Sequence, residues 1–176
     1  MDKIPLTNYQ FIAYFLPGLT LVLSLFIALE PITDFSTFAD CIKDITPAIG
    51  IVLLLSCFIA GLVLDTTRTA AVDLFIDKVL AKMKLFQRFS IEWSYLYPDT
   101  KHEVGYFYAR YYSYYCFDIN MIVAIVASMI FIDHWSILAH RWPVNVFGPI
   151  AAICLLADAG VLRMEMHNIT TGSKAT

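Results

Sequence analysis

The charged and amide side chains that could do chemistry in this sequence gather near the ends of long apolar stretches. If these stretches are helices of similar depth in a membrane, their polar ends lie close enough to interact. Two interpretations follow: the layer consists of ion pairs that tie helix ends together, or it is a charged ring that lines a conduction path or gate. The residues of this polar layer are Asp65, Arg68, Asp118, Asn120, Asp158 and Arg163.

Asp158 is the most unusual member of the polar layer, because it falls inside an apolar stretch, about one turn before Arg163. A carboxylate left in lipid costs about 2.5–3.5 kcal/mol even on lenient insertion scales. Asp158 must therefore pair with Arg163, Arg68 or another helix end, or face water in a pore.

A second cluster of cations could bind an anion or a ligand on the cytosolic side. Apolar residues between positions 72 and 89 recur at three-and-four spacing, which predicts an amphipathic helix. Its apolar stripe could lie on the inner leaflet, but acidic residues early in the segment fit an anionic surface poorly, and packing against the same stripe of other subunits is favoured. The candidate site consists of Lys78, Lys82, Lys84, Arg88 and Arg110.

Tyrosines crowd the stretch from Gly105 to Phe117, where the sequence reads GYFYARYYSYYCF. Such density is typical of the headgroup layer, where ring and hydroxyl prefer different surroundings. The alternative is a stacking surface for a base or nucleotide beside Arg110.

The sequence gives no sign of enzymatic or cofactor chemistry. The four histidines are scattered, and no pair has ligand spacing with a supporting Cys or carboxylate, so we expect no metal or haem site. Nucleophile-elbow, phosphate-loop and zinc-protease motifs are absent from the sequence. We expect a protein that is not an enzyme and carries no cofactor.

The elements that position these residues are membrane helices. Residues 48–64 are uncharged and mostly aliphatic, and a helix of that run is about 25 Å long, close to the thickness of bilayer hydrocarbon. Hydrophobic residues make up 59% of the chain and charged residues 15%, more apolar surface than a soluble core of this size needs. We predict an all-α protein with four transmembrane helices, at about 11–29, 48–64, 115–132 and 144–162, in a single membrane domain.

The segments between the spans are predicted to differ in character. Residues 30–47 read as an acidic loop with no clear helical or strand period, whereas residues 65–114 read as a helical cytosolic segment. Pro17-Gly18 predicts a kink in the first span. Small residues spaced by four in the second span, Ser56 with Ala60 and Cys57 with Gly61, would let another helix approach closely.

The distribution of basic residues predicts the orientation. Under this topology ten Lys and Arg lie on one side and two, Lys43 and Arg141, on the other. The side rich in cations should be the cytosol, so both termini are expected there. The four cysteines fall on different sides or inside spans, and we expect no intrachain disulfide.

Two short patches, Phe11–Leu19 (FIAYFLPGL) and Gly61–Arg68 (GLVLDTTR), resemble small four-span membrane components of bacterial antiphage systems. The channel effector of Hailong and the membrane subunit of Kiwa are similar in size and layout. This resemblance implies a homo-oligomer of the bacterial inner membrane, with a tetramer as the expected form. As in Hailong, it would be an ion channel restrained by a nucleotide or oligonucleotide; as in Kiwa, it would be a sensor holding a cytosolic partner protein.

The sequence therefore leaves two functional hypotheses. The first is an oligomeric ion channel or pore-forming effector gated through its cytosolic segment. The second is a non-conducting membrane sensor or scaffold. Membrane lipids and further copies of the chain are the expected partners of either.

Overall fold

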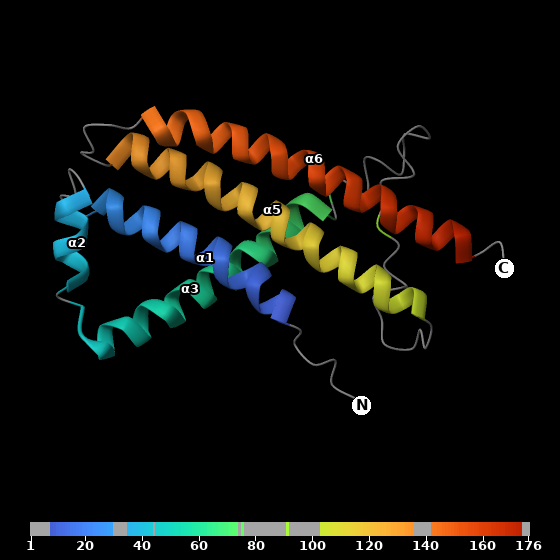
Figure 1. Cartoon of the computed structure of the whole chain (residues 1–176), viewed down its shortest axis with the longest axis horizontal. Coiled ribbons are helices and arrows are strands. Elements are labelled where there is room, and N and C mark those ends of the chain that lie inside the picture. The colour runs from blue at the N-terminus through green and yellow to red at the C-terminus, as the bar shows by residue number, and fades with distance from the viewer. Residues whose placement is uncertain are drawn as a thin grey trace.

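The computed structural model describes residues 8–29, 35–43, 45–73, 75, 91, 103–135 and 142–173. The described elements are all helical, in the order α1 (Asn8–Leu29), α2 (Phe35–Lys43), α3 (Pro47–Thr67), a π-helix η1 (Arg68–Asp73), α5 (Glu103–Trp135) and α6 (Trp142–Ser173). Figure 1 shows the long helices arranged in one elongated bundle, with α5 and α6 antiparallel and α2 across one end.

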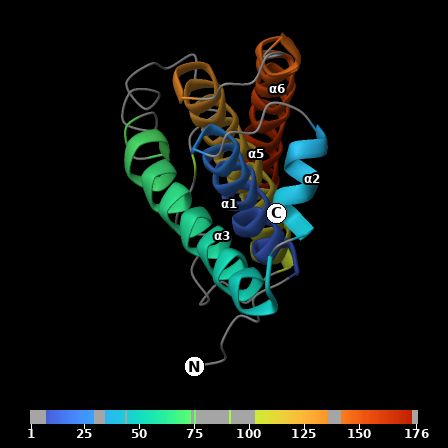
Figure 2. The same cartoon turned by 90° about the vertical axis from the view of Figure 1, so that its left-hand side faces the viewer.

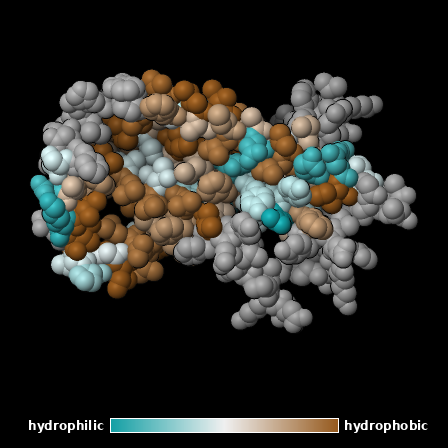
Figure 3. All heavy atoms as spheres, viewed as in Figure 1, coloured by the Kyte–Doolittle hydropathy of each residue, from teal (hydrophilic) through white to brown (hydrophobic). Residues whose placement is uncertain are grey.

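Four of these helices are long and apolar enough to cross a membrane: Ile12–Leu29, Pro47–Asp73, Phe107–Asp133 and Val144–Thr171. This confirms the predicted fold class and indicates a multi-pass membrane protein. Apolar side chains cover much of the face in Figure 3, while hydrophilic ones lie at α2 and toward the opposite end. α6 also continues past Leu162, where the sequence placed the end of the last span, to Ser173.

α3 begins at Pro47, one residue before the predicted start of the second span, and the local residues explain this start. The side chain of Thr46 accepts a hydrogen bond from the backbone N–H of Ile49, and Pro47 occupies the first helical turn. Threonine satisfies a free backbone donor there, and proline has no donor to lose. The helix then continues without interruption into η1.

α2 corrects the expectation that residues 30–47 form a loop without a helical period. Phe38, Ile42 and Ile45 are spaced by four and three residues, and they line an apolar groove together with α1 and α3. The two-turn helix has few residues in which to show its period, and the flanking acidic residues obscured it. Its exposed side carries the ion pair of Lys43 with Asp40.

Glycines let α1 and α3 cross at close range, as Figure 2 shows for the two ribbons. A Cβ added to Gly61 would stand 1.9 Å from the backbone oxygen of Tyr14, and one added to Gly18 would stand 1.8 Å from that of Cys57. Only glycine permits such an approach. The predicted close contact at Cys57 and Gly61 is confirmed, and the helix that uses it is α1 of the same chain.

Hydroxyl groups in the spans donate hydrogen bonds inside the protein. Ser128 on α5 donates to Ala124 O at 2.7 Å and shares a 2.9 Å hydrogen bond with Ser24 on α1. Thr20 and Ser56 donate to carbonyl groups of their own helices. Lipid offers no hydrogen-bonding partner, so these internal bonds satisfy the hydroxyl groups and join α1 to α5.

A cluster of buried apolar side chains lies between α5 and α6. Its described members on α5 are Tyr108, Tyr115, Cys116 and Ile119, and those on α6 are Ala159, Leu162 and Met166. Tyr108 and Tyr115 are therefore buried inside the bundle, and for these two the expectation of a headgroup belt is wrong. Their rings pack in the buried cluster that joins α5 to α6.

Candidate functional site

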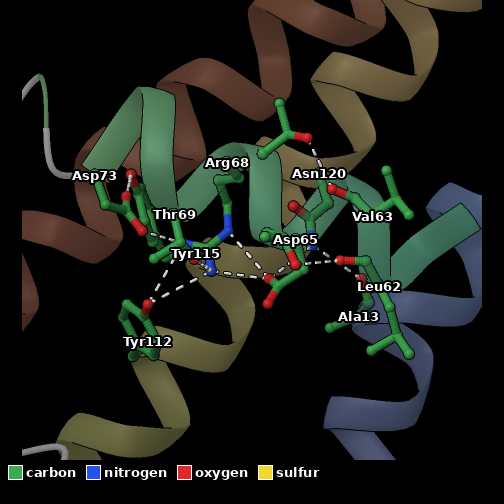
Figure 4. Close-up of polar contacts among 12 residues, drawn as sticks. Ala13, Leu62, Val63, Asp65, Arg68, Thr69, Asp73, Tyr112, Tyr115 and Asn120 are labelled. Atoms are coloured by element: carbon green, nitrogen blue, oxygen red, sulfur yellow. Dashed lines mark hydrogen bonds and ion pairs between the residues drawn. The ribbon is translucent and has the colours of Figure 1, made fainter. Parts of the chain in front are cut away.

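A network of charged side chains lies where η1 meets α5 and α6 (Figure 4). Arg68, at the start of η1, is almost fully buried. Its Nη2 donates to Asp65 Oδ1 at 2.8 Å, its Nε donates to the same oxygen at 3.2 Å, and its Nη1 donates to Asp73 Oδ2. The three-residue spacing of Asp65 and Arg68 puts this pair on one helix face, and Arg68 also pairs with a second carboxylate, that of Asp73.

The π geometry of η1 explains how Arg68 reaches Asp73. In an α-helix, residues five apart project in different directions, because a turn takes 3.6 residues. A π-helix closes its turns with hydrogen bonds between residues five apart, so positions 68 and 73 come close to one face. π-turns occur frequently at functional sites, and this one places the carboxylate of Asp73 opposite the guanidinium of Arg68.

Asp73 is the centre of the network. It is 0% exposed, and its Oδ1 accepts from Tyr115 OH at 2.7 Å and from Arg163 Nη2 at 3.1 Å, while Oδ2 accepts from Arg68. Arg163 also donates to Tyr115 OH at 2.6 Å. One carboxylate therefore joins η1, α5 and α6.

Tyrosine rings complete the surroundings of the two guanidinium groups. The Cζ atom of Arg163 lies 4.6 Å from the centroid of the Tyr115 ring, and the Cζ atom of Arg68 lies 5.5 Å from the centroid of the Tyr112 ring. Cations are attracted to the faces of aromatic rings, and more strongly where water is excluded. Part of the tyrosine-rich stretch thus serves as an internal support for buried arginines.

Asn120 links the network to the first span. Its Nδ2 donates to Asp65 Oδ1 at 3.2 Å and to the backbone oxygen of Ala13 at 3.4 Å, and the residue is 0% exposed. The network therefore spans α1, α3, η1, α5 and α6. With Arg68 and Arg163 against Asp65 and Asp73, it carries two positive and two negative charges and is formally neutral.

The remaining two members of the predicted polar layer, Asp118 and Asp158, lie outside this network. Asp118 on α5 is 4% exposed, and its Oδ2 has no hydrogen-bond partner among the described residues. Asp158 lies on α6, which packs against α5. The expected partner of Asp158, Arg163, binds Asp73 instead.

Asp158 itself is exposed on the outer face of α6. Ile153 and Leu156, in the preceding turn, are 67% and 61% exposed, so this part of α6 presents an apolar surface interrupted by one carboxyl group. The structure thus separates the predicted layer into a neutral internal network and two aspartates outside it, of which Asp118 is buried and Asp158 is exposed.

The candidate anion site falls mostly outside the described residues. This applies to Lys78, Lys82, Lys84 and Arg88, and to most of the predicted amphipathic helix at 72–89. Arg110 is exposed on α5, and its Nε donates to Tyr114 OH at 3.1 Å. A ligand site beside Arg110 stays a prediction.

Asp73 is the important residue that sequence reasoning assigned elsewhere, to the start of the amphipathic helix. A signal was available in the spacing of Asp65, Arg68 and Asp73, which follows directly on the second span. The choice of Arg163 as a further partner, 90 positions later, could not be read from spacing. No protein-family model, curated protein or solved structure matches this chain.

Proposed function

We propose that this protein is a homo-oligomeric cation channel, in which the outer face of α6 meets neighbouring subunits and Asp158 lines the ion path. The observation that carries the proposal is an exposed carboxyl group in the middle of a helix that is long and apolar enough to span a membrane. In lipid this group would cost about 2.5–3.5 kcal/mol. Assembly around an aqueous path removes that cost.

The charge distribution supports cations as the permeant class. The two buried arginines of the network are matched by Asp65 and Asp73 and leave no net positive charge there. Asp118 and Asp158 have no basic partner among the described residues. A ring of such carboxyl groups raises the local cation concentration and repels anions.

The apolar faces of α3 and α6 support self-association. Ile51, Val52 and Ile59 on α3 are each about 60% exposed, and Ile153 on α6 is 67% exposed. These faces can meet lipid or other copies of the chain, and only the second gives Asp158 polar surroundings. The sequence expectation of a tetramer remains the working form.

The cellular setting belongs to the same proposal. The resemblance of the two short patches to antiphage components favours an effector of the bacterial inner membrane, and the excess of cations near the termini favours termini in the cytosol. Gating through the segment between α3 and α5 fits this role, because η1 connects that segment directly to the network.

Purified protein in liposomes tests the function. Native mass spectrometry should show an oligomer, and the oligomer should pass K⁺ in preference to Cl⁻. Asp158→Asn keeps the side-chain volume, so assembly should survive while cation flux falls on the order of tenfold. Glu165→Gln, an exposed carboxyl further along α6, is the matched control and should leave the flux unchanged.

Two results would count against the proposal. A strictly monomeric protein in several mild detergents would remove the assembly on which it depends. An intact oligomer with no flux above empty liposomes would instead favour the non-conducting scaffold.

A further inference from the structure

The apolar groove between α1, α2 and α3 is a cavity of about 460 Å³. α1 and α3 meet where Gly18 and Gly61 cross, and they diverge from there toward α2, which lies across the open end (Figures 1 and 2). All three helices line the groove, with Val22 and Phe26 of α1, Phe38 and Ile42 of α2, and Leu54 of α3 among the lining residues.

The lining of the groove suits hydrocarbon and excludes a polar ligand. Among the described residues that line it, none has a charged, amide or hydroxyl side chain, and the thiol-bearing Cys57 is itself buried. A polar molecule would give up its hydrogen bonds to water on entering and find no replacement, which is costly. The occupant is therefore apolar.

The groove opens on the outer surface of two predicted membrane spans. Three of its lining residues, Leu23, Ile51 and Leu54, are 40%, 61% and 55% exposed. They lie in the segments Ile12–Leu29 and Pro47–Asp73, which are long and apolar enough to cross a membrane. In a bilayer this opening faces lipid tails, so lipid has direct access to the groove.

α2 places one end of the groove at the membrane surface. Phe38 and Ile42 turn its apolar side to the groove, while Lys43 and Asp40 form an ion pair on its exposed side. A helix that is apolar on one side and charged on the other is typical of the boundary between headgroups and acyl chains. The groove thus runs from that boundary into the hydrocarbon layer, which is the course of an acyl chain.

The volume of the groove fits a thin chain better than a helix of a second copy. One turn of an α-helix with its side chains occupies roughly 400–600 Å³, so a spanning helix of several turns does not fit. An apolar cavity of about 150 Å³ holds one benzene molecule. In proportion, a groove of about 460 Å³ has room for roughly eighteen carbon atoms, which is close to one acyl chain.

We propose that the groove binds one acyl chain of a membrane phospholipid, whose headgroup lies at the level of α2. The chain fills the space between the diverging parts of α1 and α3 and keeps the two helices apart there. The site is independent of the proposed function, because a channel and a non-conducting scaffold could both contain it.

A photoactivatable lipid tests the site in the full-length protein. Phosphatidylcholine with a diazirine on one acyl chain is titrated into the protein in a mild detergent, and peptide mass spectrometry locates the products of illumination. Labelling of the groove should saturate at about one lipid per chain, as expected for a single site. Val126 and Ile130 on α5, which are exposed and lie outside the groove, should be labelled in proportion to the added lipid.

Gly50→Phe fills the groove from within. A Cβ added at position 50 meets only Ile45, at 4.0 Å, and both residues line the groove, so a larger side chain enters without a clash against the backbone. Labelling of the groove should fall about tenfold, which corresponds to about 1.4 kcal/mol of binding free energy. Gly160→Phe on α6 is the matched control and should leave the labelling unchanged, because an added Cβ meets nothing within 4 Å there.

Three results would overturn the proposal. In the unchanged protein, groove labelling that rises in proportion to lipid, as on α5, would mean bulk lipid only; a folding defect in a variant cannot obscure this result. Gly50→Phe with unchanged Tm and unchanged labelling would place the lipid elsewhere. Cross-linking of a photoreactive residue at Leu54 to a second copy of the chain, in place of lipid, would assign the groove to a subunit interface.

Discussion

Replacing Asp73 with asparagine should destabilise this protein more than any other single change in the charge network. Asp73→Asn keeps the size of the side chain but removes its charge, and it turns one acceptor into a donor that faces another donor. Arg68 would then keep its ion pair with Asp65, whereas Arg163 would lose its ion pair with Asp73. Removal of one partner of a buried ion pair leaves an uncompensated charge in a site that excludes water.

The expected magnitude follows from the contacts of Asp73. Its carboxylate accepts three hydrogen bonds, from Arg68, Arg163 and Tyr115. Hydrogen bonds to a charged group contribute about 1.5–3 kcal/mol each. Removing all three would therefore lower the free energy of unfolding by at most about 4.5–9 kcal/mol. Asparagine keeps an acceptor oxygen, so we expect a loss of about 3–5 kcal/mol, the usual cost of breaking a buried pair.

The cysteines provide the assay. Cys57 and Cys116 are buried, whereas Cys41 is half-buried and Cys154 is exposed. With serine at positions 41 and 154, a thiol-reactive dye reports the unfolding of the bundle during heating. A loss of 3–5 kcal/mol should lower Tm by roughly 6–20 °C for a chain of this length.

A second variant separates charge from packing. In Asp73→Asn with Arg163→Met, one positive charge leaves together with one negative charge, and part of the loss should be recovered as a coupling of about 0.5–3 kcal/mol. Asp40→Asn is the control, because its ion pair with Lys43 is exposed and worth at most about 1 kcal/mol. The reasoning fails if the free energies of unfolding of Asp73→Asn and Asp40→Asn differ by less than about 0.5 kcal/mol. It also fails if the double variant loses as much stability as the two single variants combined.

Two further predictions concern helix packing and orientation. Gly61→Ala should push α1 away from α3, because its Cβ would overlap the backbone oxygen of Tyr14, and should cost about 1–3 kcal/mol in the same assay. Gly160→Ala is the control, since an added Cβ meets nothing within 4 Å, and equal stability of the two variants would contradict the close crossing. In intact cells, an impermeant maleimide should label Cys41 directly, and should label Thr171→Cys only after permeabilisation, in a chain otherwise free of accessible thiols. The reverse pattern would invert the proposed topology. Cys116 cannot serve as the inner reporter because it is buried.

The sequence by itself determined the four long apolar helices, because a run of about twenty apolar residues has few stable environments other than a bilayer. It also placed the start of the second span at residue 48, next to the observed start at Pro47, and the close helix contact at Cys57 and Gly61. These features depend on residues near one another in the chain, where spacing and residue type are sufficient.

Tertiary structure decided which charges meet. The pairing of Asp65 with Arg68 is local and follows from their three-residue spacing. Arg163 could have bound Asp158 five residues earlier but binds Asp73, 90 positions away. The π-turn at η1 moves Asp73 onto the face of Arg68, and the register of α5 against α6 places Tyr115 beside Arg163. Partner choice between helices depends on their rotation and axial offset, and the packing of many side chains sets both at once.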